Sequence, residues 1–121
     1  MKPLDRDLSI LRHIASYCEQ IEQTTGHFGN TYESFAANQI YRNASALCIL
    51  QIGELVGKLS ETFRAQNPAI PWRQIKAMRN IVAHSYGTVD PETTWEIICT
   101  DIPRLKNYCL EVLSNGPGND G

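Results

Sequence analysis

The 121-residue sequence lacks the hallmarks of membrane and secreted proteins. No apolar run approaches the roughly 18 residues that a membrane-spanning helix needs. The first residues, MKPLDRDLSIL, do not form the continuous apolar stretch of a signal peptide, because Asp5, Arg6 and Asp7 interrupt it. We therefore expect a cytoplasmic protein that does not associate with a membrane.

The cysteines form no C-x-x-C pair, and no histidine lies at the spacing of a zinc site. Each lies in an apolar helical context, which favours buried, reduced thiols in a cytosolic protein. The four are Cys18, Cys48, Cys99 and Cys109. No carboxylates are spaced as in a metal-dependent nuclease. We accordingly expect neither a metal nor a cofactor.

Acidic residues are absent from Arg64 through Val89, although the formal net charge of the chain is −2. The cationic and titratable side chains of this window are those of Arg64, Arg73, Lys76, Arg79 and His84. A surface that attracts anions can therefore exist on a net-acidic protein. The alternative is a chance grouping of charges on a solvated face.

Alternating strand patterns are also absent, and helical periodicity dominates the chain. A length of 121 residues suits one hydrophobic core. The sequence thus predicts an all-α, up-and-down bundle of four to five helices. We expect a single helical domain over residues 1–114 and a flexible tail over 115–121.

Capping and breaking residues set the expected helix bounds. Asp5 or Asp7 caps a first helix that runs to about Gln23, where TTGHFGN ends it. A second helical region, kinked near Asn38, extends from Thr31 or Tyr32 to Gln66, before Asn67-Pro68. A third helix starts around Trp72, and Gly87 suits the position just past its end. Asp90-Pro91 begins the last helical region, which Pro103 kinks or restarts.

Small residues line one arc of the second helical region, namely Ala46, Gly53, Gly57 and Ser60. Each glycine costs a helix interior about 1 kcal/mol relative to alanine. Such a row allows another helix to approach closely, either within the bundle or from a second copy of the chain. The apolar stripe beside it comprises Cys48, Ile49, Ile52, Leu55, Val56, Leu59 and Phe63. A polar stripe of Gln51, Glu54 and Lys58 contains one i,i+4 ion pair, worth only tenths of a kcal/mol.

The stretch MRNIVAHSYG, Met78 to Gly87, carries the candidate chemistry. Histidine titrates near neutrality, so His84 suits a general acid or base. The guanidinium of Arg79 suits the charge that develops on a phosphate during metal-independent RNA cleavage. A purely structural reading is also open: the helix dipole stabilises His84 near a helix end, and Arg79 pairs with an acid such as Glu54.

On a straight helix, Arg79 and His84 point about 140° apart, because five residues separate them. Their side chains do not converge on one substrate atom from such a helix. Two solutions reconcile them with a shared site. Either the helix loosens near Ala83, or a symmetry-related copy of the chain completes the site.

The segment RNIVAHSY resembles the R-x-x-x-x-H-x-Y signature of the HepT-like branch of the HEPN domains. The resemblance covers nearly the whole chain. Its residues, in order, are Gly53-Glu54, Pro68, Ile70-Pro71-Trp72, Arg79-Asn80, His84, Tyr86, Trp95 and Pro103. This ordered series is far more specific than an Arg–His pair alone.

The resemblance implies a homodimeric ribonuclease toxin of a type VII toxin–antitoxin system, with RNA as substrate. It also implies a minimal nucleotidyltransferase (MNT) antitoxin as partner. Arg79 and His84 match the catalytic positions, with Asn80 and Glu54 in supporting roles. Tyr86 matches the tyrosine that the antitoxin modifies with AMP, although Ser85 departs from the acidic or aromatic residue expected before it. The alternatives are a non-catalytic subunit that binds a nucleotide or a nucleotidyltransferase, and a purely structural helical dimer.

Overall fold

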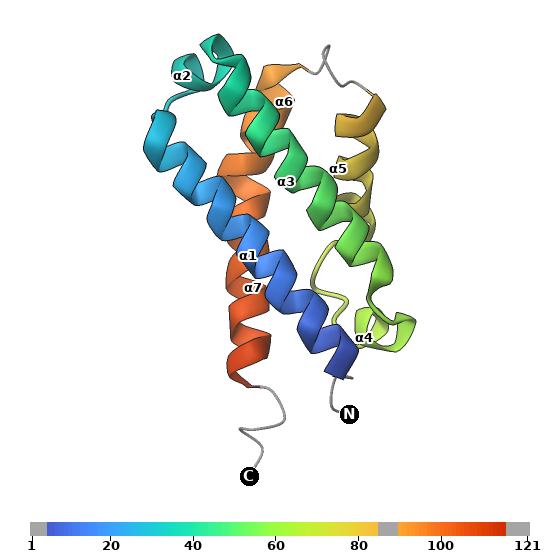
Figure 1. The fold of residues 1–121 in the computed structure, drawn as a ribbon. Coiled ribbons are helices and arrows are strands. Elements are labelled where there is room, and N and C mark those ends of the chain that lie inside the picture. Colours follow the sequence, from blue (N-terminus) through green and yellow to red (C-terminus); the bar gives the residue numbers. More distant parts are fainter. Residues whose placement is uncertain (1–4, 85–89, 116–121) are drawn as a thin grey trace.

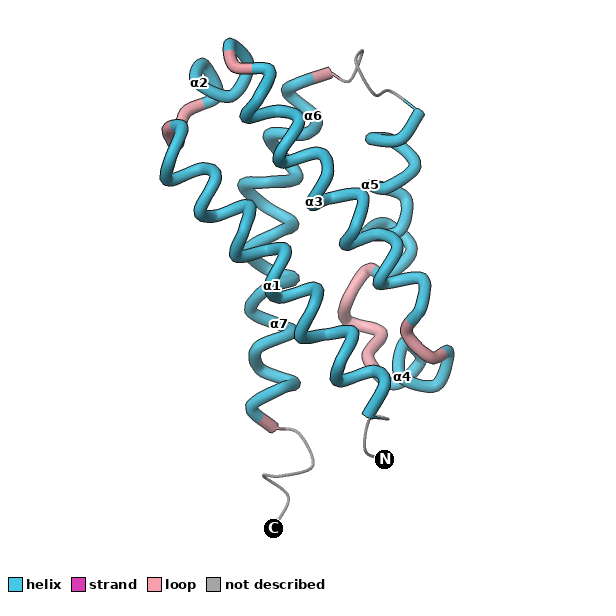
Figure 2. Tube along the Cα trace, viewed as in Figure 1, coloured by secondary structure: helices cyan, strands magenta, loops and turns pink. Residues whose placement is uncertain are grey.

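The computed structural model describes residues 5–84 and 90–115, with only the backbone described over 81–84. Its helices are α1 (Asp5–Phe28), α2 (Tyr32–Ala37), α3 (Gln39–Lys58), α4 (Glu61–Gln66), α5 (Trp72–His84), α6 (Pro91–Glu96) and α7 (Ile102–Ser114), with the π-helical turn η1 (Ile97–Asp101) between the last two. No strand occurs within these ranges (Figure 2). The rods α1, α3, α5 and α6–α7 alternate in direction (Figure 1). The predicted all-α, up-and-down bundle is confirmed.

The first helix is longer than predicted. α1 continues past Gln23 through Gly26 and ends at Phe28, and Gly29 then turns the chain with a φ of +119°. Packing overrides the expected break, because the ring of Phe28 stacks on Tyr41 at 5.3 Å between centroids. Asp7 is likewise not a cap of α1. It is buried within the helix, and its carboxylate accepts hydrogen bonds from the Ser60 N–H (2.8 Å) and Oγ–H (2.7 Å).

The second helical region is divided twice. The predicted kink at Asn38 is a true break, where the Asn38 side chain accepts from the N–H groups of Ile40 and Tyr41 and caps α3. A second break, at Leu59 and Ser60, was not predicted. There Ser60 Oγ accepts from the Phe63 N–H and caps α4. The region ends at Gln66 as expected.

The core lies between α1, α3, α5 and α7. Of the apolar stripe predicted on the second region, Leu55 is half-buried and the other residues are buried. Phe35, Tyr41 and Trp95 join α2, α3 and α6 through edge and tilted ring contacts. Three of the four cysteines are buried, but Cys99 is exposed, so its predicted burial is wrong. Its position in η1 turns it away from the core.

The last helical region begins as predicted, with the Asp90 carboxylate accepting from the Glu92 N–H ahead of Pro91. Pro103 lies in the first turn of α7, directly after η1, and the helical backbone continues without a break from Pro91 to Ser114, so Pro103 does not start a separate helix. Gly87 and residues 116–121 of the expected tail lie outside the described residues. Within the described part of the chain, no helix is long and apolar enough to cross a membrane.

Candidate functional site at the seam of α3 and α5

The seam between α3 and α5 is tight because Gly53 has no side chain. A Cβ at Gly53 would collide with the Cβ of Arg79 on α5. Gly57, one turn further along α3, leaves more room, since a Cβ there would lie 3.6 Å from Lys76 Cε. Gly53 and Gly57 therefore face α5 of the same chain, which is one of the two partners expected from the sequence.

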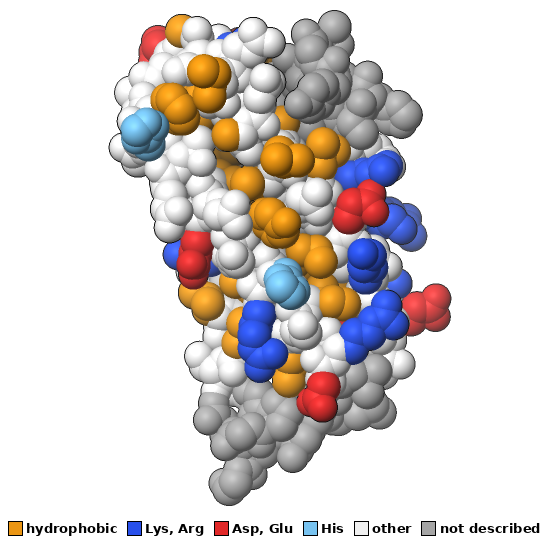
Figure 3. Space-filling view, in the orientation of Figure 1, with side chains coloured by type: hydrophobic (Ala, Val, Ile, Leu, Met, Phe, Trp, Pro, Cys, Tyr) orange, Lys and Arg blue, Asp and Glu red, His pale blue; other side chains and the backbone are white. Residues whose placement is uncertain are grey.

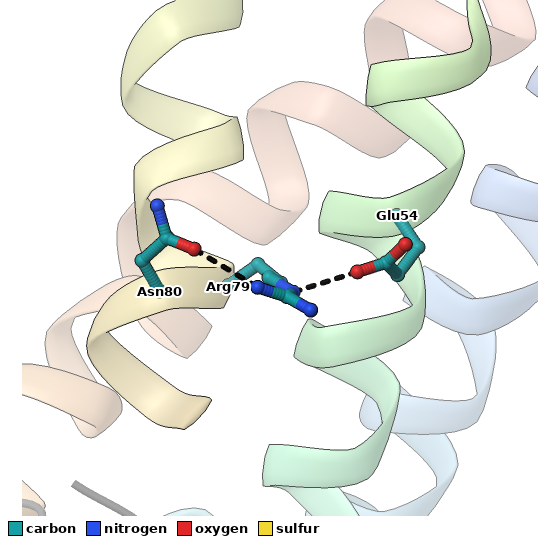
Figure 4. A network of polar contacts seen from close by, with 3 residues as sticks. All are labelled: Glu54, Arg79 and Asn80. Carbon is teal, nitrogen blue, oxygen red and sulfur yellow. Dashed lines mark hydrogen bonds and ion pairs between the residues drawn. The ribbon is translucent and has the colours of Figure 1, made fainter. Parts of the chain in front are cut away.

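Arg79 is held by two side chains beside this contact (Figure 4). Its Nε lies 2.6 Å from Glu54 Oε1 across the seam, and its Nη1 donates to Asn80 Oδ1 at 3.1 Å. The pair is partly solvated, with side-chain exposures of 42% for Arg79 and 50% for Glu54. Exposed ion pairs contribute about 0–1 kcal/mol, so the main effect of Glu54 is to orient the guanidinium.

The sequence offered two partners for Glu54, namely Lys58 on the same helix and Arg79 on another. Among the ion pairs of residues 5–80 and 90–115, Glu54 pairs with Arg79. The expected pairing of Arg79 with Glu54 is therefore confirmed, and the spacing of Glu54 and Lys58 does not decide the partner.

Two hollows open along α5 (Figure 3 shows the blue side chains gathered on this side). The first has a volume of about 290 Å³ and is lined by Gly53, Glu54, Gly57, Lys58, Lys76, Arg79 and Asn80. The second has a volume of about 560 Å³ and is lined by Glu61, Arg64, Ala65, Trp72, Arg73 and Lys76. Lys76 belongs to both, so the hollows adjoin. The two adjoining hollows thus gather four cations of the acid-free window together with Lys58, which the window missed, and each hollow also contains one glutamate.

The other motif residues are placed less fully. The α5 backbone stays helical through His84, so the helix does not loosen near Ala83. The side chain of His84 and all of Tyr86 lie outside the described residues. Along an intact helix, the Cα of His84 lies about 7.5 Å from that of Arg79 in axial rise and about 140° around it. Ile75 and Met78 face the core as predicted.

A model of the ribonuclease HepT-like family matches residues 14–112. This chain belongs to that family. It is 34% identical over 111 residues to "Putative RNase MJ0125" of Methanocaldococcus jannaschii, which covers 91% of this chain and 94% of that protein. It is 32% identical over 96 residues to "Probable ribonuclease HepT" of Thermococcus cleftensis, with coverages of 79% and 86%.

Another relative is longer, and its name gives two activities. This HepT-like chain is 34% identical over 109 residues to "Gamma-glutamylcyclotransferase and putative RNase MJ0434" of M. jannaschii. The match covers 89% of this chain but 48% of that protein, so the chain spans about half the length of that relative. No solved structure matches the chain. Within the described residues, no group of three His, Cys, Asp or Glu side chains is arranged to hold a metal ion.

Proposed function

We propose that this HepT-like protein is a metal-independent endoribonuclease, the toxin of a type VII toxin–antitoxin system. The observation that carries the proposal is the orientation of Arg79 at the rim of a basic hollow by Glu54 and Asn80. A guanidinium fixed in this way is suited to phosphate oxygens, which it can bind through two parallel hydrogen bonds. The relatives named as ribonucleases support RNA as the substrate.

In the proposed reaction, His84 takes the proton from the ribose 2′-hydroxyl, and that oxygen attacks the adjacent phosphorus. The P–O bond to the 5′-oxygen of the next nucleotide breaks, and that oxygen takes a proton from water; the protonated His84 then gives its proton to the resulting hydroxide. Arg79 stabilises the negative charge of the phosphorane between these events. The products are a 2′,3′-cyclic phosphate and a free 5′-hydroxyl, and no metal is required.

A second copy of the chain is part of the proposal. Arg79 and His84 lie about 140° apart on an intact helix, so one α5 does not aim both at a single phosphate. Ile40 and Leu47, with 70% and 55% exposure, follow one stripe of α3 at seven-residue spacing, and Glu54 is the next member. A homodimer joined along this stripe would bury the two apolar side chains and bring the partner copy to the Arg79 hollow.

Regulation by an MNT nucleotidyltransferase antitoxin completes the proposal. Transfer of AMP to Tyr86 would place a negative phosphate two residues from His84. Added negative charge and bulk at that position would repel the RNA phosphate and block access to it. The proposed outcome is a modified, silent form of the toxin.

The test is cleavage of RNA by the purified protein in the presence of EDTA. The His84→Ala variant should lose cleavage while its helical circular dichroism and unfolding midpoint stay unchanged. Arg79→Ala should lose it as well. Equal cleavage by the parent protein and the His84→Ala variant would refute the site assignment. Co-purification with a nucleotidyltransferase, without cleavage by any preparation, would favour the non-catalytic binding subunit.

A further inference from the structure

The second hollow, which adjoins the Arg79 hollow, is lined by basic side chains that take no part in the proposed reaction. Arg64 and Arg73 line it together with Lys76, and the acid in its lining is Glu61. Neither arginine belongs to the R-x-x-x-x-H-x-Y stretch. With a volume of about 560 Å³, this hollow is larger than the one at Arg79.

Hydrogen bonds and ring packing hold Trp72, which lines this hollow, against α4. The indole N–H of Trp72 donates to the Asn67 carbonyl at 3.0 Å, and the Asn67 side-chain amide donates to the Phe63 carbonyl at 2.8 Å. The rings of Phe63 and Trp72 pack at 6.0 Å between centroids. These contacts lock α4 against the start of α5 and so hold Arg64 and Arg73 at one hollow.

The positions of the cations work against helix stability. Arg73 and Lys76 lie at the second and fifth positions of α5, and the first turn of that helix contains no acidic residue. A cation in the first turn of a helix is unfavourable, because the helix dipole is positive at that end. An anion in the hollow would offset this repulsion.

The cations form a path that leads to the proposed reaction centre. Arg73, Lys76 and Arg79 follow α5 at three-residue spacing, which covers about 9 Å along the helix axis. Arg64 on α4 extends the path away from Arg79. Lys76 lines both hollows, so the path has no gap between them.

We propose that Arg64, Arg73 and Lys76 form a phosphate track. They bind backbone phosphates of a single RNA strand that lie next to the phosphate cleaved at Arg79. The inference rests on the proposed ribonuclease function for its choice of substrate. These groups contact phosphate rather than bases, so they give affinity without sequence preference. Arg64 and Arg73 are binding residues of the track and do not touch the reacting atoms.

The experiment measures the binding of a short 2′-O-methyl single-stranded oligonucleotide by fluorescence anisotropy at several salt concentrations. This probe has no free 2′-hydroxyl, so the protein cannot cleave it. Binding to a single strand loses about 0.7 in the slope of log K against log salt for each phosphate contact removed. The Arg64→Ala/Arg73→Ala variant should therefore show a slope less steep by about 1.4, and roughly tenfold weaker binding at low salt.

Two further variants make the test specific. Arg12→Ala/Arg104→Ala removes the same charge from exposed positions on α1 and α7 that line neither hollow, and its slope should equal that of the parent protein. Arg64→Lys/Arg73→Lys keeps the charges and should retain the slope. Equal slopes for both alanine variants would overturn the track. So would a lack of binding by the parent protein at low salt, which is expected if an acidic protein surface occupies the hollow.

The outcome separates this inference from the proposed function. Oligonucleotide binding that depends on Arg64 and Arg73, without any RNA cleavage, would support the track and remove the catalytic proposal. RNA cleavage with an unchanged KM in the Arg64→Ala/Arg73→Ala variant would do the reverse. If both proposals hold, that variant raises KM and leaves kcat unchanged.

Discussion

Gly53 and Arg79 meet across the α3–α5 seam so closely that no side chain fits at position 53. The backbone of one helix therefore sets the position of the arginine on the other. Gly53 is followed directly by Glu54, which binds the same guanidinium. One short segment of α3 thus fixes both the distance and the orientation of Arg79.

This contact predicts opposite effects of alanine at two glycines on α3. Gly53→Ala should lower the free energy of unfolding by about 1–3 kcal/mol, because α5 must move away from the new methyl group. It should also lower RNA cleavage, since Arg79 moves with α5. Gly57→Ala is the control: its Cβ would meet only the flexible end of Lys76, and alanine favours a helix by up to about 1 kcal/mol. Urea unfolding and cleavage assays check both variants. Similar behaviour of the two would contradict the importance of the seam.

Glu54→Gln should separate binding from catalysis. The substitution removes a negative charge from the hollow, so RNA should bind more tightly. It also loosens the hold on Arg79, and we expect kcat to fall by roughly 10-fold to 100-fold, as for other losses of precise positioning. The free energy of unfolding should change by less than about 1 kcal/mol, because the pair is exposed. Steady-state kinetics gives both parameters. An unchanged kcat would show that Asn80 and the helix contact are sufficient.

The proposed two-chain site predicts rescue between inactive variants. Arg79→Ala and His84→Ala are each expected to be silent alone. If Arg79 of one copy acts with His84 of the other, each mixed dimer has two such Arg79–His84 pairs, of which one is intact. An equal mixture, refolded together, should then regain about a quarter of the parent activity. A mixture of His84→Ala with the double variant is the control and should stay silent. Absence of rescue in mixed dimers, verified by mass, would place both residues of each pair on one chain.

The buried thiols predict a loss of stability at alkaline pH. Burial raises the pKa of Cys109 from its ordinary value of 9.0 to about 12, and burial together with the nearby Cys109 raises the pKa of Cys18 further. Above about pH 9 the unfolded chain releases protons that the folded chain retains, so the free energy of unfolding falls from there towards pH 12. Chemical denaturation over this range checks it. Cys109→Ala should flatten the decline, whereas Cys99→Ala, at the exposed thiol, should change it less.

Sequence patterns predicted the elements of this fold better than their ends. Periodicity and caps located α5 and α6, because Pro71, Asp90 and Pro91 act on their immediate neighbours. Gly26 misled the prediction, since the stacking of Phe28 on Tyr41 outweighs a local glycine penalty. The break at Ser60 depends on Asp7, which is 53 residues away and not visible to a local pattern.

The candidate site was likewise predictable only in part. The lack of acidic residues from Arg64 through Val89 indicated a positive surface, because it can be seen directly in the order of residues. The motif resemblance supplied Arg79, His84, Asn80, Glu54 and Tyr86 as candidates. That Gly53 abuts Arg79, and that Lys58 joins the first hollow, follows from the packing of two helices. The functional roles assigned to all five residues stay predictions.

The hydrogen bonds from Ser60 to Asp7 connect the first turn of α1 to the start of α4. They anchor the start of α4, the helix that bears Arg64. Trimming the chain back beyond Asp7, or a tag that frays its first turn, would release that anchor. If both proposals hold, RNA affinity would then decline more than the orientation of Arg79, because Arg79 is also held by Gly53 and Glu54 of α3. The position of a purification tag is therefore an experimental variable for this protein.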